Sequence, residues 1–131
     1  MVKANELNSV ALAYIGDAVY ELHVRRFLIE AGNVKPNELH QLAVQYVSAP
    51  AQANVIKHWL EEKMLTREEE AVFRRGRNAK THSSPKNISV EDYKYSTGFE
   101  ALIGYLYLKN DEKRLNELIE MALKKPFHKD D

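Results

Sequence analysis

Two acidic residues lie in apolar segments with helical spacing, and each has a glycine nearby. Asp17 directly follows Gly16 in LAYIGDAVYELHVRRFL, and Glu100 precedes Gly104 by four residues in STGFEALIGYLYL. A carboxylate on an apolar surface costs free energy unless something pairs with it, and each glycine inside a helix costs about 1 kcal/mol relative to alanine. Such a glycine usually allows another group to approach closely. If the two helices pack together, Asp17 and Glu100 face each other across a small polar space.

The residues alone leave two interpretations of this pair open. Two bare carboxylates repel each other, and one takes up a proton unless a cation lies between them. Hydrated Mg²⁺ fits, because it binds one or two protein carboxylates, several waters and substrate phosphate, and can then promote phosphodiester hydrolysis. In the structural alternative, each acid is the partner of a buried arginine or tyrosine, and Arg25 is available for this. Glu21, one helical turn from Asp17, is open to either role.

A second group of candidate residues is a basic segment in the middle of the chain. Residues 73–86 contain no acid, and from residue 74 onward the apolar periodicity is lost, so residues 74–88 are expected to form a loop. Gly76 would let the backbone of this loop approach a ligand. Cationic and uncharged donors together are what contacts to a nucleic-acid backbone require, although a solvated surface is the plain alternative. The candidates for RNA binding are Arg74, Arg75, Arg77, Asn78, Lys80, His82 and Lys86.

The elements that position these residues are predicted to be helices, so the fold class is all-α with a single domain over residues 1–131. Apolar spacing and capping residues predict helices over 7–30, 37–47, 49–62, from 66 to the basic loop, 89–108 and 111–124. Ser48 and Ser89 are candidate caps, and Thr66 with Glu69 forms a capping-box pattern. In helix 7–30, the apolar stripe is assigned to residues 7, 11, 14, 15, 18 and 22. Residues 126–131 form a polar tail.

Composition excludes several classes of function. The 131 residues include 19 basic and 19 acidic side chains, so no overall field attracts nucleic acid, and binding must depend on local clustering. Without cysteine there is no disulfide, thiolate nucleophile or cysteine metal site. No secretory signal is visible and the longest apolar stretch is too short to span a bilayer, so we expect a cytoplasmic protein without a membrane partner. The common hydrolase, P-loop and dinucleotide motifs are absent.

Two segments resemble a known family. ALAYIGDAVYE resembles the ribonuclease III signature, and STGFEALIGYLYL resembles the second metal-binding helix of that family, in the same order and at about the same separation. RGRNAK and PKN are similar to the short form, Mini-ribonuclease III, which consists of the catalytic domain without a double-stranded-RNA-binding domain. The resemblance covers about residues 5–125.

This resemblance implies an all-helical endonuclease, active as a homodimer, that cuts double-stranded RNA with Mg²⁺ and leaves 5′-phosphate and 3′-hydroxyl ends. It identifies Asp17 and Glu100 as catalytic metal ligands and places RNA binding on the basic segment. The apolar surface of helix 7–30 not used in intrachain packing would form the dimer interface. The implied substrate is the large-subunit (23S) ribosomal RNA precursor, with a ribosomal protein or the assembling subunit as a further partner.

The chain also departs from the longer members of the family. They carry further glutamates where this chain has Val10 and Ala13, and an aspartate where it has Thr97, so two of the usual carboxylates are matched. Ala13 and Thr97 would leave space for water in place of ligand oxygens. The alternative functions are a catalytically silent RNA-binding homologue and a helical interaction domain.

Overall fold

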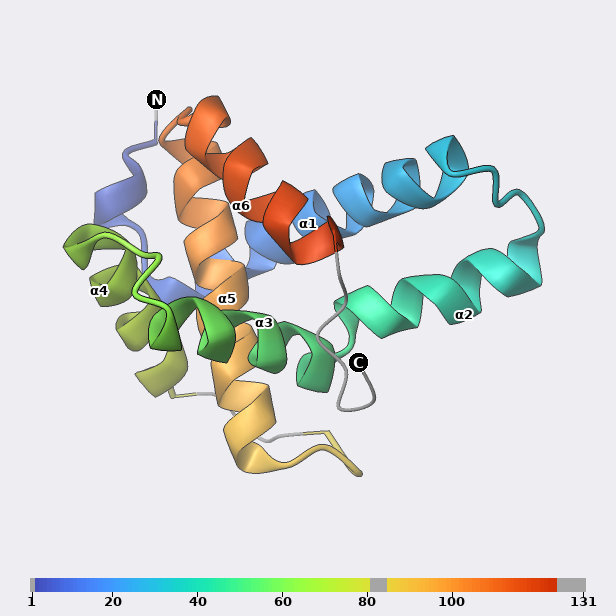
Figure 1. Cartoon of the computed structure of the whole chain (residues 1–131). Coiled ribbons are helices and arrows are strands. Elements are labelled where there is room, and N and C mark those ends of the chain that lie inside the picture. Colours follow the sequence, from blue (N-terminus) through green and yellow to red (C-terminus); the bar gives the residue numbers. More distant parts are fainter. Residues whose placement is uncertain (1, 81–84, 125–131) are drawn as a thin grey trace.

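The computed structural model describes residues 2–80 and 85–124, and within these ranges the chain is helical with no strand. The expected all-α fold is therefore confirmed (Figure 1). The elements are η1 (Ala4–Glu6), α1 (Ser9–Glu30), α2 (Pro36–Val47), α3 (Ala49–Glu61), α4 (Arg67–Asn78), α5 (Val90–Leu108) and α6 (Glu112–Lys124). No helix in these ranges is long and apolar enough to cross a membrane.

The caps predicted from the sequence begin three of these helices. The Ser48 hydroxyl accepts a hydrogen bond at the start of α3, and Ser89 does the same for α5. At α4, the Thr66 hydroxyl accepts from the Glu69 N–H while the Glu69 carboxylate accepts from the Thr66 N–H, which completes the capping box. Local hydrogen bonding to orphan N–H groups thus fixes where these helices begin.

Helix α5 is the central element of the fold (Figure 1). It packs most extensively against α1, then against α4 and α3, while α1 and α2 extend together to one side. Between residues 96 and 106, every side chain of α5 is buried except that of Glu100. A helix that is apolar on nearly all sides is expected at the centre of a helical domain.

Glycines allow α1 and α5 to cross at very short range. A Cβ atom added to Gly16 would overlap the backbone carbonyl of Glu100, and one added to Gly104 would overlap the carbonyl of Leu12. The expectation that these two glycines permit close approach is confirmed. The crossing brings the turn that carries Asp17 directly against the turn that carries Glu100.

The loop expected over residues 74–88 is wrong in its first part, because α4 continues to Asn78. Gly76 is buried, and a Cβ there would lie 2.9 Å from the Ala101 Cβ and from the Gly98 Cα. Gly76 therefore serves the packing of α4 on α5 rather than the approach of a ligand to a loop. The helix persists through this polar sequence because Phe73 and Gly76 bury one face of its last turns.

The apolar stripe that predicts the first helix, at residues 7, 11, 14, 15, 18 and 22, is not the face that α1 buries within the chain. The structure buries a different face of α1, made of Leu12, Ala13, Gly16, Val19, Tyr20, Val24 and Leu28. Tyr14 and Leu22, which belong to the stripe, are 83% and 68% exposed. Helix α1 has apolar residues on both sides, so spacing alone did not identify the buried one; the close crossing at Gly16 selects it.

Candidate active site

Asp17 and Glu100 meet at the crossing of α1 and α5. Asp17 is exposed and Glu100 is half-buried, and their carboxyl groups are in hydrogen-bonding contact. Burial raises the pKa of Glu100 to about 9, and the hydrogen bond to Asp17 and its negative charge act in the same direction. Two carboxyl groups in contact cannot both ionise without compensation. At neutral pH the Glu100 carboxyl therefore keeps its proton unless a cation binds.

No cation of the described chain compensates this pair. Within residues 2–80 and 85–124, no lysine or arginine forms an ion pair with Asp17 or Glu100. Arg25, the partner considered from the sequence, pairs with Glu21 instead, at 3.2 Å between Nη2 and Oε1. The structural alternative in which Arg25 compensates Asp17 is therefore wrong. Glu21 lies close enough for its charge to contribute to the raised pKa of Glu100.

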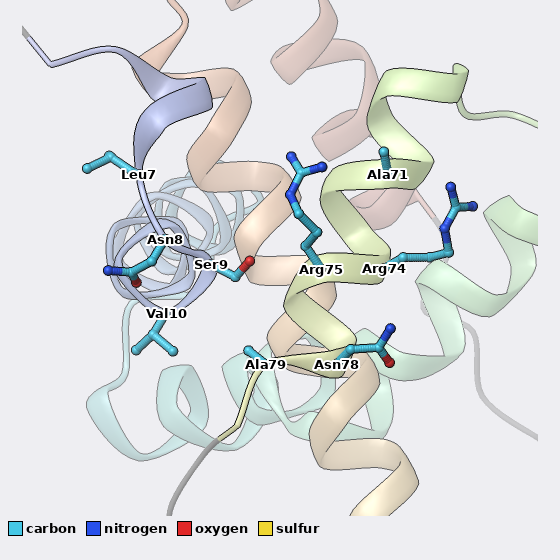
Figure 2. Close-up of a pocket in the computed structure, with 9 residues that line it drawn as sticks. All are labelled: Leu7, Asn8, Ser9, Val10, Ala71, Arg74, Arg75, Asn78 and Ala79. Atoms are coloured by element: carbon cyan, nitrogen blue, oxygen red, sulfur yellow. The ribbon is translucent and has the colours of Figure 1, made fainter.

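A basic groove of about 750 Å³ lies between α4 and the start of α1 (Figure 2). Figure 2 shows the Arg75 side chain between these two elements, with Ser9 facing it from the start of α1. Arg75 makes no ion pair with the described residues, and Arg74 makes only a long one to Glu70, at 3.8 Å. The groove is lined by Leu7, Asn8, Ser9, Val10, Ala71, Arg74, Arg75, Asn78 and Ala79.

The other predicted RNA-binding residues do not line this groove. The Arg77 guanidinium lies 5.7 Å from the ring centroid of Phe73 and 5.9 Å from that of Tyr95, so it stacks on aromatic side chains. Lys80 and Lys86 are exposed. His82 lies outside the described residues, as does the tail of residues 126–131. The structure thus brings together Arg74, Arg75 and Asn78 out of the predicted set.

Comparison of the sequence with known proteins shows the family of this chain. The model of the ribonuclease III domain matches residues 10–111, which include both Asp17 and Glu100. The chain belongs to the ribonuclease III family. It is therefore an endoribonuclease of the ribonuclease III type, and the resemblance seen in the sequence is confirmed.

Relatives and a solved structure agree with this assignment. Mini-ribonuclease 3 of Enterococcus faecalis is 51% identical over 120 residues, 92% of this chain and 91% of the relative. Mini-ribonuclease 3 of Streptococcus pneumoniae is 48% identical over 125 residues, 95% of this chain and 98% of the relative. The crystal structure of a Fusobacterium nucleatum protein superposes with a TM-score of 0.80 at 28% identity, and the match covers 91% of this chain and 93% of that one.

One residue beside the Asp17–Glu100 pair was missed by sequence reasoning. Gln52 on α3 is buried, and its side chain lies against the Glu100 carboxyl, where it lowers the pKa that burial raises. The available signal was a glutamine among the apolar positions of APAQANVIKHWL. A buried amide in an apolar helix face needs a partner, but the sequence does not show that the partner comes from α5.

The carboxylate pair fits Mg²⁺ through its donor chemistry. Two carboxyl oxygens in contact without a compensating cation favour a divalent ion with oxygen ligands. The described residues contain no group of three or more His, Asp or Glu side chains placed to hold a metal ion, so an ion here would complete its shell with water or phosphate. Ala13 and Thr97 occupy positions where the longer family members carry acidic residues. Ala13 is buried, and the Thr97 hydroxyl donates to the Tyr93 carbonyl at 3.0 Å. Thr97 is therefore engaged by its own helix.

Proposed function

We propose that this chain is a Mg²⁺-dependent endoribonuclease specific for double-stranded RNA, with Asp17 and Glu100 as its metal ligands. The observation that supports this is the contact between the two carboxyl groups at the glycine crossing, with no cation of the described chain to compensate them. Holding two acids together costs free energy that the fold alone does not repay. A ligand that needs both carboxylates explains why they are there.

In this proposal the two acids and the helix crossing that holds them have separate roles. Asp17 and Glu100 would hold the ion, and the Glu100 carboxyl would release its proton to solvent to serve as a ligand. When bound, Mg²⁺ supplies an activated water and positive charge for the leaving oxygen. The tight packing of α1 on α5 keeps the two carboxylates in register, which limits the motion available to them during the reaction. Cleavage would leave 5′-phosphate and 3′-hydroxyl ends.

RNA binding is proposed to centre on the groove beside α4. Arg74, Arg75 and Asn78 offer one amide and two guanidinium groups along one wall, a combination suited to phosphate oxygens. Lys80 and Lys86 would extend this contact along the backbone, with His82 and Arg77 as further contacts. A-form RNA is recognised mainly through its phosphates, its 2′-hydroxyls and its shape, so little sequence reading by this surface is expected.

The proposed assembly is a homodimer that uses the exposed apolar face of α1. Val10, Tyr14, Leu22 and Ile29 are each more than half exposed, and large apolar side chains that gather on one exposed side of a helix favour an interface. Two sites in a dimer would act on the two strands of one duplex. The implied biological role is maturation of the 23S ribosomal RNA precursor in the cytoplasm, with a ribosomal protein or the assembling subunit as a partner.

The decisive experiment is cleavage of long double-stranded RNA by the purified protein with Mg²⁺ and then with EDTA, beside the variants Asp17→Asn and Glu100→Gln. We expect Mg²⁺-dependent cutting by the original chain and a loss of at least about 100-fold in either variant, because each lacks a charged ligand. Both variants should melt close to the original temperature, since Glu100 is already neutral at pH 7 and neither substitution breaks an ion pair among the described residues. Cutting that persists in EDTA would contradict the proposal.

A further inference from the structure

Gln52 lies in the middle of the α3 face that packs on α5. Only 1% of its surface is exposed, and the residues around it on this face are apolar and buried: Ala53, Val55, Ile56 and Trp59. Glutamine is rarely buried to this extent in a helical core. Its presence among these side chains requires an explanation.

Packing does not supply that explanation. Neither Nε2 nor Oε1 of Gln52 forms a well-directed hydrogen bond to any residue that the structure describes. Leaving a buried polar group without a partner costs on the order of 1–3 kcal/mol. An apolar residue of the same shape would avoid this cost, so stability of the fold would favour methionine or leucine at this position.

The neighbouring polar group is the carboxyl of Glu100. The Gln52 amide is close enough to it to lower its pKa, while Asp17 and Glu21, which approach from α1, raise it. Three elements therefore meet at the Glu100 carboxyl: α1 with two acids, α5 with Glu100 itself, and α3 with an uncharged amide. Gln52 is the neighbour that can donate a hydrogen bond to it from the core side.

We infer that Gln52 is a positioning residue of the candidate active site: its amide N–H, which lies beside the Glu100 carboxyl, donates to that carboxylate once it ligates a metal and keeps it in the orientation that faces Asp17. This inference rests on the proposed function, because the orientation of Glu100 matters only if that carboxylate is a metal ligand. A carboxylate on a single flexible side chain samples several rotamers, and a donor from a second helix selects one. Partners of this kind typically contribute about 10-fold to 100-fold in metal affinity or activity.

The first test is the variant Gln52→Met, which keeps the length of the side chain and removes the amide. We expect thermal stability of the metal-free protein to be unchanged or raised, because a buried amide without a well-directed hydrogen bond is lost. On double-stranded RNA with metal present, kcat should fall about 10-fold to 100-fold with KM unchanged. A merely structural role predicts the reverse: lower stability with full kcat per folded molecule. Tyr20→Phe is the matched control, since it also removes a buried polar atom without a partner and should keep full kcat.

The second test measures metal binding without RNA. Titrating the protein with Mn²⁺ and following the free ion by electron paramagnetic resonance reports affinity directly. We expect Gln52→Met to weaken Mn²⁺ binding about tenfold and Tyr20→Phe to leave it unchanged. Glu100→Gln should abolish binding at this site.

The outcomes separate this inference from the proposed function. If Glu100→Gln is inactive but Gln52→Met keeps its original kcat and Mn²⁺ affinity, only the role of Gln52 is overturned. If Glu100→Gln remains active, the proposed metal site itself is wrong. Should Gln52→Met fail to fold, Gln52→Leu repeats the test, and failure of both variants to fold would show that Gln52 is structural.

Discussion

Glu69 and Glu100 are acidic side chains that the fold places in contrasting surroundings. Glu69 accepts hydrogen bonds from the Arg114 guanidinium, at 2.8 Å from Nε and 2.9 Å from Nη2, and its pKa is lowered although burial acts to raise it. Among the residues that the structure describes, Glu100 has no such cation, and its pKa is raised. The chain thus compensates the acid that supports α4 and α6, and leaves uncompensated the one at the candidate active site.

At the residue scale, Arg114→Met should destabilise the protein at pH 7 by about 3–5 kcal/mol, because it leaves Glu69 buried without a cation. The stabilisation from a carboxylate with a lowered pKa is present above its ordinary pKa of 4.5 and is lost as pH falls through the lower folded value. Urea unfolding of both proteins at pH 7 and pH 3 measures this. The difference in unfolding free energy between the original protein and Arg114→Met should be smaller at pH 3 than at pH 7. An equal difference at the two pH values would contradict the role of Glu69 ionisation.

At the scale of elements, the glycine crossing makes a sharp prediction for Gly104→Ala. Alanine favours the helix by about 1 kcal/mol, but its Cβ would overlap the Leu12 carbonyl, and overpacking of this kind costs about 1–3 kcal/mol or more. We expect a net loss of stability and, in the molecules that remain folded, a loss of RNA cleavage, because α1 and α5 are pushed apart.

Gly32→Ala is the control for this crossing. Gly32 has a φ of +100°, and a Cβ there would meet no atom within 4 Å, so alanine costs backbone strain of about 1–2 kcal/mol without moving any helix. Thermal melts should show destabilisation of both variants, while cleavage per folded molecule should fall only for Gly104→Ala. Equal cleavage by the two would contradict a link between the crossing and the site.

Sequence reasoning predicted the elements well where the signal is local. The starts of three helices could be predicted from Ser48, Thr66 and Ser89, because a cap and the N–H group that it accepts from are close in the sequence. The buried face of α1 cannot be identified from spacing, because apolar residues lie on both sides of the helix. The end of α4 was mistaken because Gly76 resembles a loop residue unless its contact with α5 is known. Asp17 and Glu100 were predicted as a pair. Gln52 was not predicted, because its position beside Glu100 depends on how α3 packs on α5.

At the scale of the whole molecule, the formal net charge is zero, so the proposed binding of RNA depends on a local cluster of cations. Replacing Arg74 and Arg75 together with alanine should weaken binding of double-stranded RNA and reduce the slope of log affinity against log salt by about one for each lost phosphate contact. Filter binding between about 50 and 200 mM salt measures the slope, because phosphate contacts change the affinity strongly over this range. Arg67→Ala, at the opposite end of α4, is the control; an unchanged slope in the double variant would exclude the groove.

The proposed dimer is tested on the exposed face of α1. Leu22→Glu should convert a dimer into a monomer, because a charge buried in an apolar interface lacks compensation, yet it should barely change folding of the monomer since Leu22 is mostly exposed. Sedimentation velocity checks the oligomeric state. Val90→Glu replaces an exposed apolar residue on another helix and should leave the dimer intact; a monomeric original chain would contradict the proposal.

The crossing of α1 and α5 also bears on when activity arises during protein synthesis. The ribosome makes α1 first, and the turn of α5 that contacts it follows after α2, α3 and α4 have been made. At about 5–20 residues per second, Asp17 spends several seconds in a nascent chain that does not yet contain Glu100. A half-made chain therefore cannot assemble the carboxylate pair, and under the proposed function the nuclease gains its activity only when its central helix is in place.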